Sequence, residues 1–168
     1  MNMNASIAEK KIKELGIPDM PLREITPVRT QLATDWFQKY KILCHEFMRS
    51  LSDNIDTLAM LNLTQEEFMG VLTGRALPEN LSFRFRVPLI WGGKMEIENM
   101  FICKTFPHSL NMDIFIMSQT ENQTVWVPDP AKKIYLPIGN LAGGAGGNGT
   151  EDRITESIAS ELASNHDM

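Results

Sequence analysis

Residues 82–88 read Ser-Phe-Arg-Phe-Arg-Val-Pro, and this stretch decides the fold class. Apolar and polar side chains alternate along it, which is the period of a β-strand with one polar face. Before Pro78 the apolar residues instead recur every three or four positions, as they do in helices. This change of period predicts an α+β protein in which N-terminal helices pack on a sheet.

The sequence after this strand predicts an antiparallel meander of about five strands. Gly92 and Gly93 form a two-glycine turn typical of a tight hairpin, so residues 95–104 are expected to return beside the first strand. Residues 110–117 are apolar on both faces of an alternating pattern, which favours a central, doubly covered strand. Two further short strands are expected at residues 124–127 and 133–136.

A long helix is expected at residues 27–54, with Thr26 as its N-cap and Pro27 in its first turn. Its apolar stripe is rich in aromatic residues and wider than one sheet face requires. Aromatic side chains of this kind pack in the core or contact a partner. We therefore expect Trp36, Tyr40 and Phe47 to be interface residues.

A second, short helix is expected at residues 65–73. Thr64 and Glu67 have the spacing of a capping box, in which each side chain bonds to the other residue's backbone N–H. Leu63 and Phe68 occupy the hydrophobic-staple positions. Gly74 follows the helix, where a left-handed conformation commonly ends it.

The two ends of the chain differ in composition from the middle. Residues 1–25 are expected to be a polar arm, and residues 26–140 to be a single α+β domain, the usual number for 168 residues. Residues 141–168 combine a flexible glycine-rich tether with a C-terminal helix. The apolar residues Ile154 and Ile158 of that helix are expected to contact a partner or the domain surface.

The composition argues against several classes of partner. The net charge is −5 and the sequence pI is about 5.2, which disfavours non-specific binding to nucleic acid or anionic membranes. No apolar run approaches the roughly 20 residues that span a bilayer. The only two cysteines, Cys44 and Cys103, do not make a disulfide framework. We expect a protein that is cytoplasmic where it is synthesised.

No motif indicates a metal or cofactor. The glycine-rich run at residues 144–150 lacks the lysine that a phosphate-binding loop requires, so a linker explains it better than a nucleotide site. The three histidines His45, His108 and His166 have no metal-site spacing. The helix that begins after Leu63 resembles the first helix of a helix-turn-helix DNA-binding motif. Strand sequence follows it where that motif requires a recognition helix, so we reject this interpretation.

Two other functions are alternatives. Arg84 and Arg86 share one face of the first strand and could contact a nucleic-acid backbone. Cross-strand ion pairs with Glu96 and Glu98 explain the same arginines without a ligand. A small enzyme with a dispersed site around Asp113 and His108 is the second alternative, although no catalytic motif is recognisable.

Several short stretches resemble small tail or baseplate assembly proteins of large contractile-tailed bacteriophages. They are Phe83–Pro88, Lys104–Pro107, Asp113–Ile116 and the glycine-rich segment leading to Asp152 and Arg153. No functional residue carries over from this resemblance, which implies a structural or assembly role in a virion. The sequence as a whole predicts a non-enzymatic subunit whose partners are other proteins or a second copy of itself.

Overall fold

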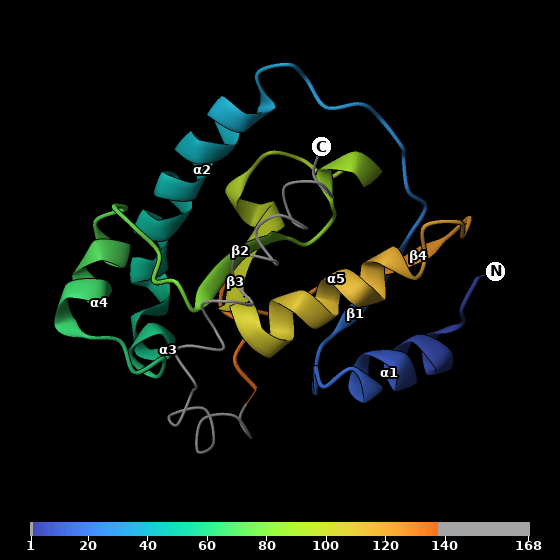
Figure 1. The fold of residues 1–168 in the computed structure, drawn as a ribbon, viewed down its shortest axis with the longest axis horizontal. Helices are drawn as coiled ribbons and strands as arrows, with labels where there is room; N and C mark the ends of the chain where they lie inside the picture. Colours follow the sequence, from blue (N-terminus) through green and yellow to red (C-terminus); the bar gives the residue numbers. More distant parts are fainter. Residues whose placement is uncertain (1, 138–168) are drawn as a thin grey trace.

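The computed structural model describes residues 2–137, and Figure 1 shows how their elements are arranged. The strand β3 (Met100–Lys104) lies at the centre, with buried side chains on both of its faces. Phe101 and Cys103 belong to one hydrophobic cluster, and Met100 and Ile102 belong to another. We call the first the α5 cluster and the second the α2 cluster, after the helices that cover them.

The prediction of helices packed on strands is confirmed, but the five-stranded meander is wrong. The strands form two separate antiparallel pairs. One joins β2 (Leu81–Phe85) to β3, and the other joins β1 (Leu22–Ile25) to β4 (Val125–Pro128). Residues 133–136 contribute only one parallel bridge, between Ile134 and Ile102. The run expected to be the central strand, residues 110–117, is helical, so no strand of the described residues joins the two pairs into a wider sheet.

The expected return strand is confirmed for residues 100–104, which pair antiparallel with β2, but the tight two-glycine turn before it is wrong. The connection from β2 to β3 contains two 3₁₀ turns, Leu89–Trp91 and Ile97–Asn99. Gly92 ends the first turn at φ +93°, and a Cβ on Gly93 would lie 1.9 Å from the Val87 carbonyl oxygen. The glycines are needed for a close backbone approach, not for a tight turn between strands.

The expected central strand at residues 110–117 is a helix, α5 (Leu110–Met117). A short run that is apolar on every side fits a helix packed in a core as well as a doubly covered strand. In the helix its two polar residues point to different sides, and each has a partner elsewhere in the fold. Asn111 donates to the Leu15 carbonyl at 2.7 Å, and Asp113 pairs with Arg84.

The N-terminal residues, expected to be an arm, are packed into the α5 cluster. Helix α1 (Ala5–Glu14) is capped by Asn4 and buries Ala8 and Ile12. Trp126 of β4 donates from its indole nitrogen to the Met3 carbonyl at 2.9 Å. These contacts join residues more than 100 positions apart in the chain, so no local pattern signals them.

The predicted helix at 27–54 is correct only in its second part. Helix α2 (Trp36–Ser50) continues as a 3₁₀ turn (Leu51–Asn54) and as α3 (Ile55–Ala59). Residues 26–35 have no helix because their backbone bonds elsewhere: Val28 donates to the Trp91 carbonyl at 3.0 Å. The extended contact outweighs the local helix-start signal at Pro27.

The short second helix is confirmed as α4 (Gln65–Leu72). Thr64 and Glu67 form both hydrogen bonds of the capping box, at 3.1 and 2.9 Å. Gly74 follows at φ +74°, where its N–H bonds to the Val71 carbonyl. The expected tether and C-terminal helix, with Ile154 and Ile158, lie outside the described residues.

Candidate functional site

A buried ion pair joins β2 to α5. Arg84 Nη1 lies 2.8 Å from Asp113 Oδ1, and the two side chains are only 6% and 3% exposed. The same nitrogen donates to the backbone and hydroxyl oxygens of Ser109, at 3.1 and 3.0 Å. This buried pair holds α5 against the strand, because separating the charges inside the protein is costly.

The titratable groups around this pair are held neutral. Burial lowers the pKa of His108 to about 4, with a smaller contribution from Lys104. Burial also raises the pKa of the Cys103 thiol to about 12 and raises the pKa of Tyr135. The His108 and Tyr135 rings meet edge to face at 5.2 Å. The structure thus gathers Asp113 and His108, the candidate enzyme residues, into a closed interior that solvent does not reach.

Arg86 joins the segment that follows β4 to the β2–β3 strand pair through hydrogen bonds. Its guanidinium donates to the carbonyls of Glu98, Pro130 and Lys132 and lies 3.4 Å from Asp129. Desolvation lowers the pKa of this group, and the Asp129 carboxylate partly opposes that effect. Arg86 is therefore a structural tie within the protein.

The expected basic strand face does not form an open surface. Arg84 is in the interior, and the side chain of Arg86 is 13% exposed. The carboxylates that pair with the arginines are Asp113 and Asp129, instead of the expected Glu96 and Glu98. Asp113 and Asp129 are far along the chain from their partners, so cross-strand register could not reveal them.

A recess of about 660 Å³ lies beside Arg86. Arg23, Lys132 and Lys133 contribute positive charge to its lining, and Asp129 and Glu98 contribute negative charge. Arg23 already faces Asp129 at 3.6 Å, and Lys133 faces Asp53 at 3.8 Å. With Arg86 included, four cationic and two anionic side chains line the recess, a net charge of +2, so it favours an anionic ligand over a cationic one.

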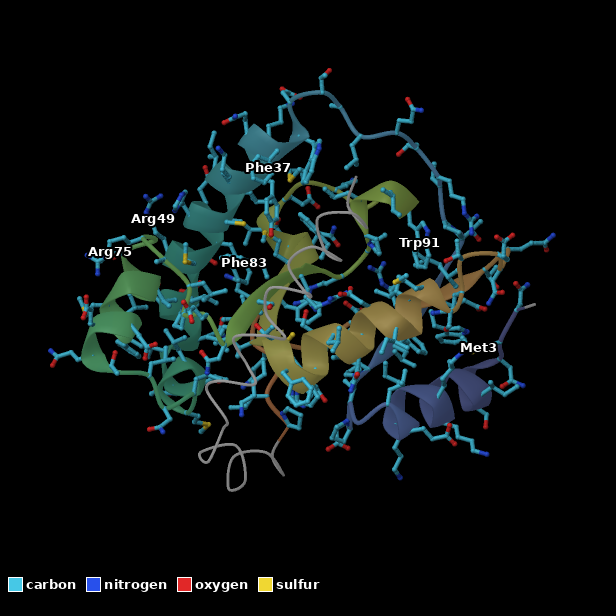
Figure 2. The ribbon with its side chains drawn as sticks, in the orientation of Figure 1. Met3, Phe37, Arg49, Arg75, Phe83 and Trp91 are labelled. Atoms are coloured by element: carbon cyan, nitrogen blue, oxygen red, sulfur yellow. The ribbon has the colours of Figure 1, made fainter. Side chains whose placement is uncertain are left out.

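An aromatic ridge, made of Trp36, Phe37 and Tyr40, stands on the first turns of α2. Phe37 meets Trp36 edge to face at 5.5 Å and stacks on Tyr40 at 6.4 Å. Tyr40 in turn packs on Phe85 at 5.8 Å, which anchors the ridge to β2. Figure 2 labels Phe37 near the N-terminal end of α2, where its ring is 47% exposed.

No protein-family model, curated protein or solved structure matches this chain. Within residues 2–137, no cluster of three or more His, Cys, Asp or Glu side chains could hold a metal ion. None of the helices in this range has the length and apolar character needed to cross a membrane.

The three residues of α2 that were expected at an interface differ in their burial. Trp36 and Tyr40 are half-buried in the ridge, whereas Phe47 is fully buried and packs against Phe83 at 6.2 Å. Phe47 is therefore a core residue within this chain. Phe37 was not among the expected interface residues, although its spacing from Tyr40 could have signalled it.

Proposed function

We propose that this protein is a structural or assembly subunit that binds another protein through the aromatic ridge. The observation that carries the proposal is Phe37, a large aromatic ring left 47% exposed while its neighbours hold it in place. Exposed aromatic side chains anchored in this way dominate the binding energy of many protein interfaces.

The ridge is prepared for binding. Trp36 and Tyr40 are half-buried and Tyr40 rests on the buried ring of Phe85, so the aromatic side chains are already ordered. Little side-chain entropy remains to be lost when a partner covers Phe37. The Lys41 ammonium lies 5.0 Å from the Phe37 ring centre, which orients this side chain further.

The surroundings of the ridge indicate the chemistry of the partner. Lys39 and Lys41 are exposed beside it, and the Lys39–Asp35 pair at 3.5 Å is too exposed to neutralise that charge effectively. A partner with an apolar centre and a rim of carboxylates fits this surface. Residues 31–35 are mostly exposed and lead into the ridge, and they enlarge the area toward the roughly 800 Å² that a stable interface buries on each side.

The resemblance to tail and baseplate assembly proteins of contractile-tailed bacteriophages supports a virion subunit as the partner. In that case the protein is made in the cytoplasm and is then incorporated in the particle.

The test compares two substitutions on the same helix. Ile42 is 60% exposed and lies five residues after Phe37, about 140° around α2. Phe37→Ala should weaken the complex about tenfold, the effect of losing roughly 1.4 kcal/mol. Ile42→Ala should leave it unchanged. The readout is the mass of the complex isolated from the native source, measured by light scattering after size exclusion.

Equal behaviour of the two variants would contradict the proposal. A wild-type protein that is a monomer and retains no partner would also contradict it.

A further inference from the structure

Helix α5 has an uncovered apolar stripe, made of Leu110, Ile114 and Met117. The spacing of these residues places them on one side of the helix, opposite the buried residues Phe115 and Ile116. Ile114 is 46% exposed and Met117 is 51% exposed. Figure 1 shows α5 in front of the strands with α1 along one side.

This stripe is unusual for a surface helix, which normally presents polar side chains to water. The two polar residues of α5 are committed to contacts within the protein, Asn111 with Leu15 and Asp113 with Arg84. The outer side therefore offers only apolar atoms. A segment that covers it would remove this area from water.

The size of the stripe decides between the possible occupants. Three side chains cannot supply the roughly 800 Å² per partner that a stable interface with a second copy needs. A segment of the same chain needs far less contact, because its covalent connection to the domain holds it at an effective concentration in the millimolar range. The small area favours an occupant from this chain.

Close to its described end, at Pro137, the chain passes the segment that leads into α5. The ring of Tyr135 lies 5.2 Å from that of His108, which is two residues before Leu110. Residues 138–150 follow, and thirteen residues can span up to about 45 Å, whereas α5 is about 12 Å long. Residues 151–163 can therefore reach the whole stripe.

The composition of residues 151–168 matches this surface. Ile154, Ile158 and Leu162 have the spacing of one side of a helix, as in the stripe itself. Residues 151–168 contain five acidic residues and one arginine, and so account for four of the five net negative charges of the chain. Helix α1, which packs beside α5, carries Lys10, Lys11 and Lys13 together with Glu9 and Glu14, a net charge of +1.

We propose that residues 151–163 bind the α5 stripe of their own chain, with Ile154, Ile158 and Leu162 placed against Leu110, Ile114 and Met117. This contact covers the apolar side of α5 and is independent of the aromatic ridge on α2.

Arg153 makes the proposal testable by proteolysis of the full chain. It is the only lysine or arginine after Lys133, so tryptic cleavage there releases one identifiable C-terminal peptide. Binding of residues 151–163 to α5 protects this bond. Ile158→Asp and Ile114→Asp should each speed cleavage after Arg153 roughly tenfold, the change expected when about 1.4 kcal/mol of contact is lost.

Two matched substitutions are the controls. Ser160→Asp adds the same charge on the opposite side of the expected helix, and Ile42→Asp adds it at an exposed position of α2. Both should cleave at the wild-type rate. Met117→Asp repeats the test on the stripe, and circular dichroism establishes that each variant is folded.

Three results would overturn the proposal. Wild-type cleavage rates in both Ile158→Asp and Ile114→Asp would show that no such contact exists. Faster cleavage in Ile158→Asp and in Phe37→Asp, but not in Ile114→Asp, would place the segment on the aromatic ridge. Protection of Arg153 that grows with protein concentration would make the occupant a second copy. None of these results depends on whether Phe37 binds a partner.

Discussion

The two faces of β3 are stabilised by different means. The α2 cluster on one face consists of closely packed apolar side chains, including Phe47, Leu51 and Val71. The α5 side contains most of the buried polar groups of the described residues, among them Arg84, His108, Asp113 and Gln119. Apolar packing tolerates adjustment, whereas a buried polar network is stable only when its members keep their partners.

The solvent-facing sides of the two covering helices, α2 and α5, also differ. Helix α2 keeps the usual division between an apolar inner side and a mostly polar outer side, with Phe37 and Ile42 as exceptions. Helix α5 is apolar on both sides, since Phe115 and Ile116 are buried while Ile114 and Met117 face outward. The polar contacts hold α5 in place without using its outer apolar side, which remains free to bind.

The largest effect is expected from breaking the buried ion pair. Asp113→Ala leaves the Arg84 charge inside the protein and should lower the free energy of unfolding by about 3–5 kcal/mol. Urea unfolding followed by circular dichroism measures the change. The double variant Arg84→Met with Asp113→Leu should recover most of the loss. A loss below about 1 kcal/mol in Asp113→Ala would mean that the pair does not hold α5.

The next largest effect is expected from lowering the pH, because the buried His108 on the α5 side makes the stability of the protein depend on pH. The pKa of His108 is about 4 in the folded protein and 6.5 ordinarily, so the unfolded chain binds more protons between these values. Stability is therefore fully present above pH 6.5 and is lost as the pH falls toward 4. Between pH 6.5 and 5 the loss should be about 1.5 kcal/mol.

Thermal unfolding across this range measures the effect, with His108→Leu as the comparison. The variant should have a flatter profile than the wild type. Identical profiles would show that His108 accepts a proton without disturbing the fold.

Removing the cap of α4 tests the α2 side. Thr64→Ala loses the hydrogen bond to the Glu67 backbone and should lower the free energy of unfolding by about 1 kcal/mol. Thr30→Ala, at an exposed position outside the helices, should change it by less than about 0.5 kcal/mol. Similar losses in the two variants would mean that the capping box contributes nothing specific.

The smallest effect on stability is expected at the proposed binding surface. Phe37→Ala removes a half-exposed ring and should lower the free energy of unfolding by only about 0.5 kcal/mol. Phe47→Ala, which empties a fully buried site, should cost about 3–5 kcal/mol. Chemical denaturation of both variants checks the contrast. A large loss in Phe37→Ala would make the ridge part of the core instead of a binding surface.

The sequence predicts best those features that depend on neighbouring residues. The capping box at Thr64 and Glu67, the left-handed Gly74 and the strand through Phe83 all follow from spacings of a few positions. Helix α5 could not be predicted in this way, because its apolar run fits a strand equally well. Its polar residues pair with Arg84 and Leu15, which lie far away in the chain.

The same reason limits what the sequence reveals about function. The aromatic ridge follows from the i, i+3 and i+4 spacing of Trp36, Phe37 and Tyr40 on one helix. The positions of Arg84 and Arg86 do not follow from their alternation on β2. Asp113 and Asp129, which pair with them, belong to other elements. The two arginines that suggested a basic strand surface instead form ion pairs within the protein.

Site-specific photo-crosslinking at position 37 tests the central claim most directly. A photoreactive amino acid placed at Phe37 in the full chain, expressed in the native source, should join it to one protein partner of defined mass. The same group at Ile42, which is more exposed but lies on another side of α2, should give no such product. The same product from both positions, or no product from position 37, would contradict the aromatic ridge as the binding surface of an assembly subunit.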